Sequence, residues 1–357
     1  MIGISVYLAR ENRRFNREWI KKAHEHGFTA IFTSLHIPEE DPAFYKELLL
    51  ELGRQAQYYQ MDLFADISPE SFRHLQIGID QAGKLAEWGV TGLRVDYGFG
   101  IGEMAALSRQ LKLQLNASTL TEEVMEALHK AGLYTENTEA SHNYYPRPET
   151  GLAREYFLQK NQLLKSWNLR ISAFVPGDGQ KRQPLFEGLP TLEMHRYVSP
   201  VYACLDLMEN GLVDSVYVGD LSLRDETLAM FPMVKERIIP LRYRGVSLAE
   251  FKHIHEYLNG IQTNRIDPAR DVIRIEGSRT AFHNRRLQPN NTIGRPKGTI
   301  TIDNEKYGRY AGEIQITRTD LEQDDKVNVI GRVIDEDIPL LSLIGGGRKC
   351  LLQQVNE

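Results

Sequence analysis

The sequence predicts an α/β protein with an N-terminal (β/α)₈ TIM barrel over residues 1–237 and a small all-β domain over residues 238–357. In the first two-thirds of the chain, short apolar runs alternate with longer amphipathic runs, and eight such repeats are what a closed barrel requires. A doubly wound sheet usually has fewer strands and a glycine-rich phosphate fingerprint after its first strand, which this sequence lacks. From residue 271 onward, β-branched residues alternate with polar ones between short polar links, which predicts a small antiparallel barrel or sandwich.

Local signals define the predicted helices. Ser68-Pro69-Glu70 is typical of a helix start, because proline is well tolerated in the first turn. The Thr119-x-x-Glu122 spacing can form a capping box for a helix that begins at Thr119 or Thr121 and ends at Gly132. The predicted helices of the chain are residues 17–26, 42–59, 119–132, 152–167, 191–210 and 247–258.

The predicted barrel strands are the short apolar runs between these helices. The sixth is the least regular, since it follows a polar stretch that does not itself resemble a strand. The eight strands are residues 2–8, 29–35, 62–67, 92–95, 113–116, 139–143, 169–175 and 214–218.

Composition excludes several classes of protein. The 357 residues include 43 Lys and Arg against 48 Asp and Glu, a net charge of −5, which argues against a nucleic-acid partner. The two cysteines cannot form a disulfide framework or a metal knuckle. No apolar stretch approaches the roughly 20 residues of a membrane span. The first basic residues follow the opening apolar run, the reverse of a signal peptide. We therefore expect a cytoplasmic protein without a membrane partner.

The active site of a TIM barrel lies at the C-terminal ends of its strands, where this chain places many polar residues. Taken singly, each has an ordinary interpretation. Asp66 could cap the next helix, and Asp96 could pair with Arg94, which lies two residues away on the same face of a strand. A lone His142 is more often structural than catalytic. Only their convergence at one barrel mouth favours a functional site. The candidate residues are Ser34, His36, Asp66, Arg94, Asp96, Asn116, His142, Asn143, Tyr145, Arg147, Glu149, Lys181, Arg182 and Asp220.

These residue types suit some reactions better than others. No lysine stands at a strand end, which argues against a Schiff-base aldolase. No His-x-His or His-Glu-x-x-His spacing occurs at these strand ends, so no metal site is predicted. A metal site formed by His36, Asp66, Asp96 and His142 stays open as an alternative. Two of the carboxylates could act as acid and base across a glycosidic bond. Asn and Tyr side chains would then bind sugar hydroxyls or an amide, while Arg and Lys would bind anionic groups.

Two glycine-rich loops, residues 98–102 and 177–182, follow the fourth and seventh strands. Barrels often bind phosphate with the loops after strands seven and eight, where backbone N–H groups face the ligand. Plain tight turns explain both loops equally well.

Six segments of the chain are more distinctive than any of these features. The most specific is His-Asn-Tyr-Tyr-Pro-Arg-Pro-Glu-Thr-Gly at residues 142–151, and the others are residues 3–8, 32–40, 65–69, 92–99 and 115–119. Together they resemble the MupG family of bacterial 6-phospho-N-acetylmuramidases over essentially the whole chain. The resemblance implies an N-terminal barrel and a C-terminal cyclophilin-like β-barrel. It also implies a cytoplasmic glycoside hydrolase of cell-wall recycling, whose substrate is N-acetylmuramic acid 6-phosphate β-1,4-linked to N-acetylglucosamine.

Such a substrate, a phosphorylated amino-sugar disaccharide, would use the candidate residues in three ways. We expect the acid and the nucleophile or base among Asp66, Asp96 and Glu149, with Asp220 in reserve, unless the acetamido group itself attacks. Sugar contacts would come from Ser34, His36, Asn116, His142, Asn143 and Tyr145. The phosphate and the lactyl carboxylate would meet Arg94, Arg147, Lys181 and Arg182.

Two other functions remain open from the sequence. One is a metal-dependent isomerase or epimerase of sugar phosphates that uses the same barrel mouth. The other is a non-catalytic sugar-phosphate sensor, in which the C-terminal domain relays binding to a partner. The hydrolase needs no cofactor, and a homodimer in which the C-terminal domain closes the mouth is compatible with the sequence.

Overall fold

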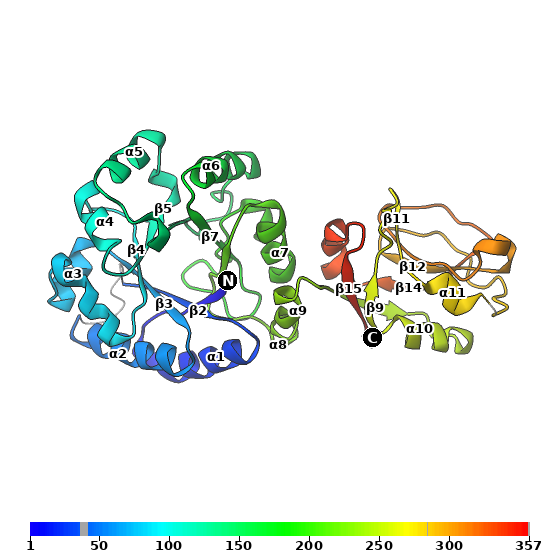
Figure 1. Cartoon of the computed structure of the whole chain (residues 1–357). Coiled ribbons are helices and arrows are strands. Elements are labelled where there is room, and N and C mark those ends of the chain that lie inside the picture. The colour runs from blue at the N-terminus through cyan, green and yellow to red at the C-terminus, as the bar shows by residue number, and fades with distance from the viewer. Residues whose placement is uncertain (36–41, 284, 356–357) are drawn as a thin grey trace. The chain divides into compact units, whose positions relative to one another are not determined.

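The computed structural model describes residues 1–35, 42–283 and 285–355, and within them eight parallel strands close into a barrel (Figure 1). Neighbouring strands pair in sequence order, and the pairing of β1 with β8 completes the ring. The predicted barrel is therefore confirmed. Its strands are β1 (Ile2–Ser5), β2 (Ala30–Ser34), β3 (Asp62–Ile67), β4 (Gly92–Val95), β5 (Lys112–Asn116), β6 (Thr138–Ser141), β7 (Arg170–Val175) and β8 (Ser215–Val218).

Helices surround this ring of strands (Figure 1). Ser68 accepts a 3.3 Å hydrogen bond from the Ser71 backbone N–H and caps α3, as the sequence predicts. Of the two predicted starts for the fifth α-helix, Thr121 is the N-cap, because its hydroxyl accepts from the Val124 N–H. The helices are α1 (Arg13–Glu25), α2 (Pro42–Tyr58), α3 (Pro69–Leu75), α4 (Ile101–Leu107), α5 (Glu122–Lys130), α6 (Arg154–Ser166), α7 (Pro200–Asn210) and α8 (Asp225–Leu228).

The helix predicted over residues 191–210 is wrong at its start, since α7 begins only at Pro200. The residues before it form a loop with one short 3₁₀ turn, Glu193–His195, and the backbone of Thr191 is paired outside this segment. The Thr191 N–H donates to the carbonyl oxygen of Phe174 on β7, and the Thr191 carbonyl accepts from the N–H of Leu152. Those hydrogen bonds tie the β7–α7 connection to β7 and to the loop after β6, and they replace the helical bonds that the sequence pattern suggested.

An aromatic layer fills the middle of the barrel. Phe32, Phe64, Phe174 and Tyr217 are almost completely buried and pack around Ala30. The rings of Phe32 and Phe174 meet edge to face at 5.1 Å, a favourable aromatic geometry. Large side chains can occupy this layer because strand residues alternate between the inside and the outside of the barrel. The polar residues at the strand ends therefore lie above a closely packed apolar layer.

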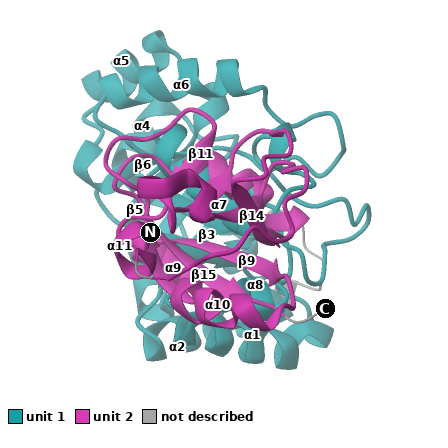
Figure 2. Ribbon diagram, turned by 90° about the vertical axis from the view of Figure 1, so that its right-hand side faces the viewer, with its two compact units in different colours: residues 1–229 teal, residues 230–357 magenta. Residues whose placement is uncertain are grey.

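The second compact unit spans Met230–Glu357, and the first spans Met1–Ala229 (Figure 2). The division therefore falls within the segment that the sequence assigned to the barrel. Its cause is α9 (Phe231–Lys235), which packs against the first strand of the second unit.

The second unit is built on a seven-stranded sheet in its described residues, in the order β10-β15-β9-β14-β12-β13-β11. Neighbours pair antiparallel except β15 and β9, which pair in parallel. A single bridge between Asn264 and Ile275 links the segments that follow the two edge strands. The predicted β-rich domain is present, together with the short helices α10 (Lys252–Leu258) and α11 (Ser278–Phe282). The strands are β9 (Ile239–Gly245), β10 (Gly260–Thr263), β11 (Val272–Arg274), β12 (Thr299–Asp303), β13 (Ile314–Thr317), β14 (Val327–Val333) and β15 (Lys349–Gln354).

In the part of the chain that the structure describes, no helix has the length and apolar character that crossing a membrane requires.

Candidate active site

Three polar residues form one row across neighbouring barrel strands. Ser34 on β2 is the register partner of Asp66 on β3, which is in turn the partner of Arg94 on β4. Nη1 of Arg94 donates to Oδ1 of Asp66 at 2.9 Å, and the Ser34 hydroxyl lies 3.4 Å from Oδ2 of Asp66. Arg94 is only 4% exposed, so this ion pair is largely removed from water. A pair in such a place orders both side chains, because breaking it would leave a buried charge without a partner.

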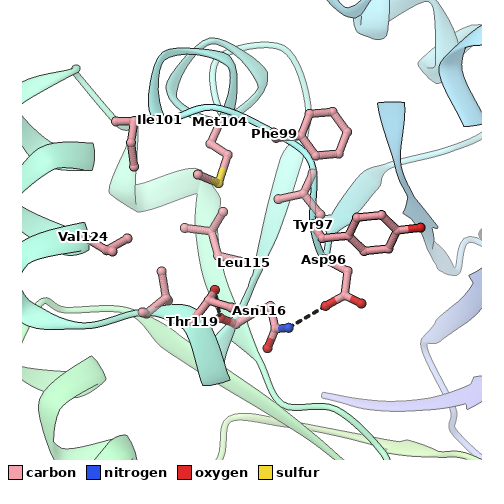
Figure 3. A pocket seen from close by; sticks show the side chains of 11 residues that line it. Asp96, Tyr97, Phe99, Ile101, Met104, Leu115, Asn116, Thr119 and Val124 are labelled. Carbon is pink, nitrogen blue, oxygen red and sulfur yellow. Dashed lines mark hydrogen bonds between the residues drawn. The ribbon is translucent and has the colours of Figure 1, made fainter. Parts of the chain in front are cut away.

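A second carboxylate, Asp96, lies beside this row just after β4. Nη2 of Arg94 is 3.8 Å from Oδ1 of Asp96, so one guanidinium spans the two carboxylates. The side-chain amide of Asn116, at the end of β5, donates to the same Oδ1 (Figure 3). Oδ1 of Asn116 accepts from the N–H and the hydroxyl of Ser118 at 2.9 and 2.7 Å, which fixes the amide with its NH₂ toward Asp96. Among the described residues, Oδ2 of Asp96 has no partner.

The loop after β6 brings Asn143 and Tyr145 to the same cluster. Oδ1 of Asn143 accepts a hydrogen bond from Nη2 of Arg94. Tyr145 is half-buried, and burial raises the pKa of its phenol, with Tyr156, Arg94 and Asp96 close enough to act on it as well. A neutral phenol in that place can donate or accept a hydrogen bond from a sugar.

His142 is not part of this cluster. Its Nε2 lies 2.7 Å from Oδ1 of Asn161 on α6, and its ring packs at a tilt against Phe157 with the centroids 4.6 Å apart. Burial lowers the pKa of His142 to about 4, so the ring is neutral near pH 7. Because Asn161 and Phe157 both belong to α6, the His142 ring faces the helix layer, whereas Asn143 contacts Arg94 at the mouth.

Arg147 and Glu149 lie on the exposed part of the same loop. The carboxylate of Glu193 accepts the backbone N–H groups of Glu149 and Gly151 at 2.8 and 2.7 Å. Arg196 donates twice to Glu193 at 2.6 Å and once, at 3.2 Å, to the carbonyl of Arg147. These bonds from Arg196 lower the pKa of Glu193 to about 2, so the carboxylate is ionised at neutral pH.

Glu193 and Arg196 fix the loop that carries Arg147 and Glu149, and neither residue was predicted from the sequence. Opposite charges three residues apart are a weak signal, because surface helices show the same spacing without any such role. The helix predicted over this segment also concealed the loop that the pair stabilises.

Asp220 lies beneath the loop after β7 and is completely buried. Its two carboxylate oxygens accept the backbone N–H groups of Gly177, Arg182 and Leu189 at 2.8, 3.1 and 3.2 Å. Burial raises its pKa, and these hydrogen bonds act in the opposite direction. Asp220 therefore shapes this loop and stands apart from the pair of carboxylates bridged by Arg94. A Cβ on Gly177 would lie 2.5 Å from the carbonyl oxygen of Ser222, so only glycine allows this close approach.

Arg182 points from this loop into the barrel mouth. Its guanidinium lies 4.0 Å from the centre of the Tyr7 ring, and its Nη1 donates to the Tyr144 hydroxyl at 2.8 Å. Lys181, half-buried beside it, has neither hydrogen-bond nor ion-pair partner among the described residues. The loop's N–H groups at Gly177, Gly179, Gln180 and Arg182 already have acceptors within the protein. Anion binding here would therefore depend on the two cationic side chains.

A mostly apolar cavity of about 290 Å³ adjoins Asp96 between the ends of β4 and β5 and the helices α4 and α5 (Figure 3). We call it the β4–β5 pocket. Asp96, Asn116 and Thr119 are its polar lining residues besides Tyr97. The apolar lining residues are Val95, Phe99, Ile101, Met104, Leu115, Leu120 and Val124.

His36 lies outside the described residues. Within residues 1–35, 42–283 and 285–355, no group of three or more His, Cys, Asp or Glu side chains is arranged to hold a metal ion.

Comparison with known proteins covers both compact units. The family model described as 6-phospho-N-acetylmuramidase, N-terminal, matches residues 2–232, and its C-terminal counterpart matches residues 246–353. A crystal structure of a conserved Enterococcus faecalis protein with an unknown function is 42% identical, with a TM-score of 0.90 over 99% of this chain and 96% of that one. An uncharacterized B. cereus protein is 24% identical, with a TM-score of 0.79 over 99% of both chains, and supports the fold. A search of curated protein sequences gave no match.

Proposed function

The chain belongs to the MupG family of 6-phospho-N-acetylmuramidases, which are glycoside hydrolases, and from this we propose that it hydrolyses N-acetylmuramic acid 6-phosphate β-1,4-linked to N-acetylglucosamine. In that reaction the bond between C1 of the muramic sugar and the bridging oxygen breaks. Water supplies a hydroxyl to C1 and a proton to the departing O4 of glucosamine. The setting would be the recycling of cell-wall fragments in the cytoplasm.

The observation that carries the proposal is the pair of carboxylates, Asp66 and Asp96, spanned by the guanidinium of Arg94 at the barrel mouth. Glycosidic bonds are commonly cleaved by two carboxyl groups, one at the leaving oxygen and one at the anomeric carbon. A binding protein without catalytic chemistry has no need of two adjacent acidic groups that share one cation.

The Asp66–Asp96 carboxylate pair and the cations of the loop after β7 lie on opposite sides of the mouth. In a closed ring of eight strands, β4 and β8 are diametrically opposed. Asp96 follows β4, whereas Lys181 and Arg182 follow β7, and the Arg182 N–H donates to Asp220, which follows β8. In a pyranose, the 6-phosphate and the 2-acetamido group also lie on opposite sides of the ring. The phosphate would therefore bind Lys181 and Arg182 while C1 and C2 face the carboxylates.

We assign the remaining roles from how exposed each side chain is and from which part of the substrate it could reach. Asp66, buried and paired with Arg94, would carry the negative charge that stabilises the positive charge developing at C1. Asp96, whose Oδ2 has no partner among the described residues, would act beside it on water or on the acetamido group. Glu149, on the exposed loop after β6, is the candidate for the proton that the leaving oxygen needs. Arg147, on the same loop, would meet the lactyl carboxylate.

Incubation with the phosphorylated disaccharide, with its unphosphorylated form and with EDTA tests this function. Mass spectrometry should show N-acetylmuramic acid 6-phosphate and N-acetylglucosamine from the phosphorylated sugar, with or without EDTA. In ¹⁸O-labelled water the label should appear on the muramic sugar, because the C1–oxygen bond is the one that breaks. An unchanged disaccharide after prolonged incubation with folded protein would contradict the proposal.

A further inference from the structure

We infer that the β4–β5 pocket receives the N-acyl group of the muramic sugar and accepts acyl chains longer than acetyl. The inference rests on the proposed function and names a part of the substrate that the catalytic residues do not explain. Its basis is the shared rim, since Asp96 and Asn116 belong both to the cluster around Arg94 and to the lining of this pocket.

The chemistry of the lining selects the occupant. None of the residues around this pocket is cationic, and Asp96 places a carboxylate on its rim. A phosphate or a lactyl carboxylate would therefore find no counter-charge there and would be repelled by Asp96. An N-acyl group is uncharged, carries one N–H donor and ends in a hydrocarbon, which matches a carboxylate rim with apolar walls.

The free oxygen of Asp96 supplies the acceptor for that donor. Asn116 occupies Oδ1 and is itself locked by Ser118, so this part of the rim is rigid. Oδ2, which has no partner among the described residues, can accept the amide N–H. In that orientation the acyl methyl would lie at the Asp96 end of the pocket, and a longer acyl chain would extend past Leu115 toward Val124. In Figure 3, Asp96 and Val124 lie on opposite sides of the group of lining side chains.

The size of the pocket predicts how long an acyl chain it can accept. A cavity of about 290 Å³ is far larger than one methyl group requires. A closely fitted methyl site would discriminate by roughly tenfold or more for each added methylene. A site with unused apolar volume should accept two additional methylenes with little loss, because the longer chain gains contact with Ile101, Met104 and Val124.

The test is a series of 4-methylumbelliferyl β-glycosides of muramic acid 6-phosphate that carry N-acetyl, N-propionyl or N-butyryl groups. The wild-type kcat/KM should stay within about threefold across the series. The variant Val124→Phe narrows the far end of the pocket, and the ratio of kcat/KM for N-butyryl to that for N-acetyl should fall about tenfold or more. The ratio is independent of how much of each preparation is folded. The matched control Glu126→Phe adds the same ring at an exposed position on α5 and should leave the ratio unchanged.

Three negative results are distinguishable. Cleavage of the N-acetyl compound with tenfold or stronger rejection of N-butyryl by the wild type would overturn the pocket assignment and leave the hydrolase intact. An unchanged ratio in Val124→Phe would overturn it as well. If no compound of the series is cleaved and the disaccharide is also untouched, the hydrolase is contradicted and this inference falls with it.

Discussion

Nη1 of Arg94 lies 2.9 Å from Oδ1 of Asp66, and the two residues are direct register partners on β4 and β3. Both are largely buried at the barrel mouth, where the ion pair is shielded from solvent. The same guanidinium reaches Asp96 and Asn143, so three strand ends depend on one side chain. This arrangement joins the stability of the barrel to the geometry of its site.

Replacing Arg94 with alanine should destabilise the protein by about 3–5 kcal/mol, because Asp66 would remain buried without its counter-charge. Urea unfolding at neutral pH measures the change. Arg14→Ala is the control, since Arg14 pairs with Glu18 on the solvent side of α1 and should change stability by less than about 1 kcal/mol. Equal stability of the two variants would show that the buried pair contributes no more than a surface pair.

Asp96→Asn should lower turnover of the phosphorylated disaccharide by about 10²–10⁴-fold, the usual contribution of a side chain that transfers or orients a proton. The amide oxygen of asparagine can still accept from Asn116, so the melting temperature should change little. Asp62→Asn is the matched control, because Asp62 begins β3 and pairs with Lys112 at the opposite end of the barrel. Turnover in Asp96→Asn close to that of the control would remove Asp96 from the mechanism.

Lys181→Ala should raise the KM for the phosphorylated substrate by roughly tenfold, because a hydrogen bond to a charged group contributes about 1.5–3 kcal/mol. The value of kcat should fall less than kcat/KM if this contact mainly holds the ground state. Lys130→Ala, which removes an exposed partner of Glu126 on α5, is the control for loss of one positive charge. A KM for Lys181→Ala equal to that of the control would place the phosphate elsewhere.

His142 should make the folded state sensitive to mild acid. Its pKa is about 4 in the folded protein and 6.5 in an unfolded chain, and the cause is burial. Above pH 6.5 both states hold a neutral imidazole and the group has no effect. As pH falls below 6.5, the unfolded state binds a proton that the folded state does not, so stability decreases until about pH 4. This linkage corresponds to about 2 kcal/mol between pH 7 and pH 5.

Urea unfolding of wild type and His142→Gln at pH 7 and pH 5 isolates that effect from other titrating groups. Glutamine retains a polar contact for Asn161 but does not titrate. The loss of stability between the two pH values should be smaller in the variant by about 2 kcal/mol. An identical loss in both proteins would show that His142 titrates normally in the folded state.

The sequence by itself determined the barrel and the positions from which its site is built. Alternation of apolar and amphipathic runs is a local property, and it specifies strands and helices wherever burial on one face is required. The spacing of Arg94 and Asp96 predicted that they share one face of the fourth strand. In the structure, Nη2 of Arg94 lies 3.8 Å from Oδ1 of Asp96, which directly follows β4. Strict use of the same alternation would also have separated His142 from Asn143.

Only the tertiary structure decided which of these residues lie in contact with one another. Arg94 lies closer to Asp66, 28 positions away along the chain, than to Asp96, two positions away. The reason is that strand register is set across the sheet and not along it. The loop-shaping role of Asp220 and Glu193 could not be predicted, since both bind backbone N–H groups, which carry no sequence signal. The β4–β5 pocket likewise exists only where two strand ends and two helices leave space between them. Periodicity is encoded locally, whereas register, loop pairing and cavities arise when distant segments pack together.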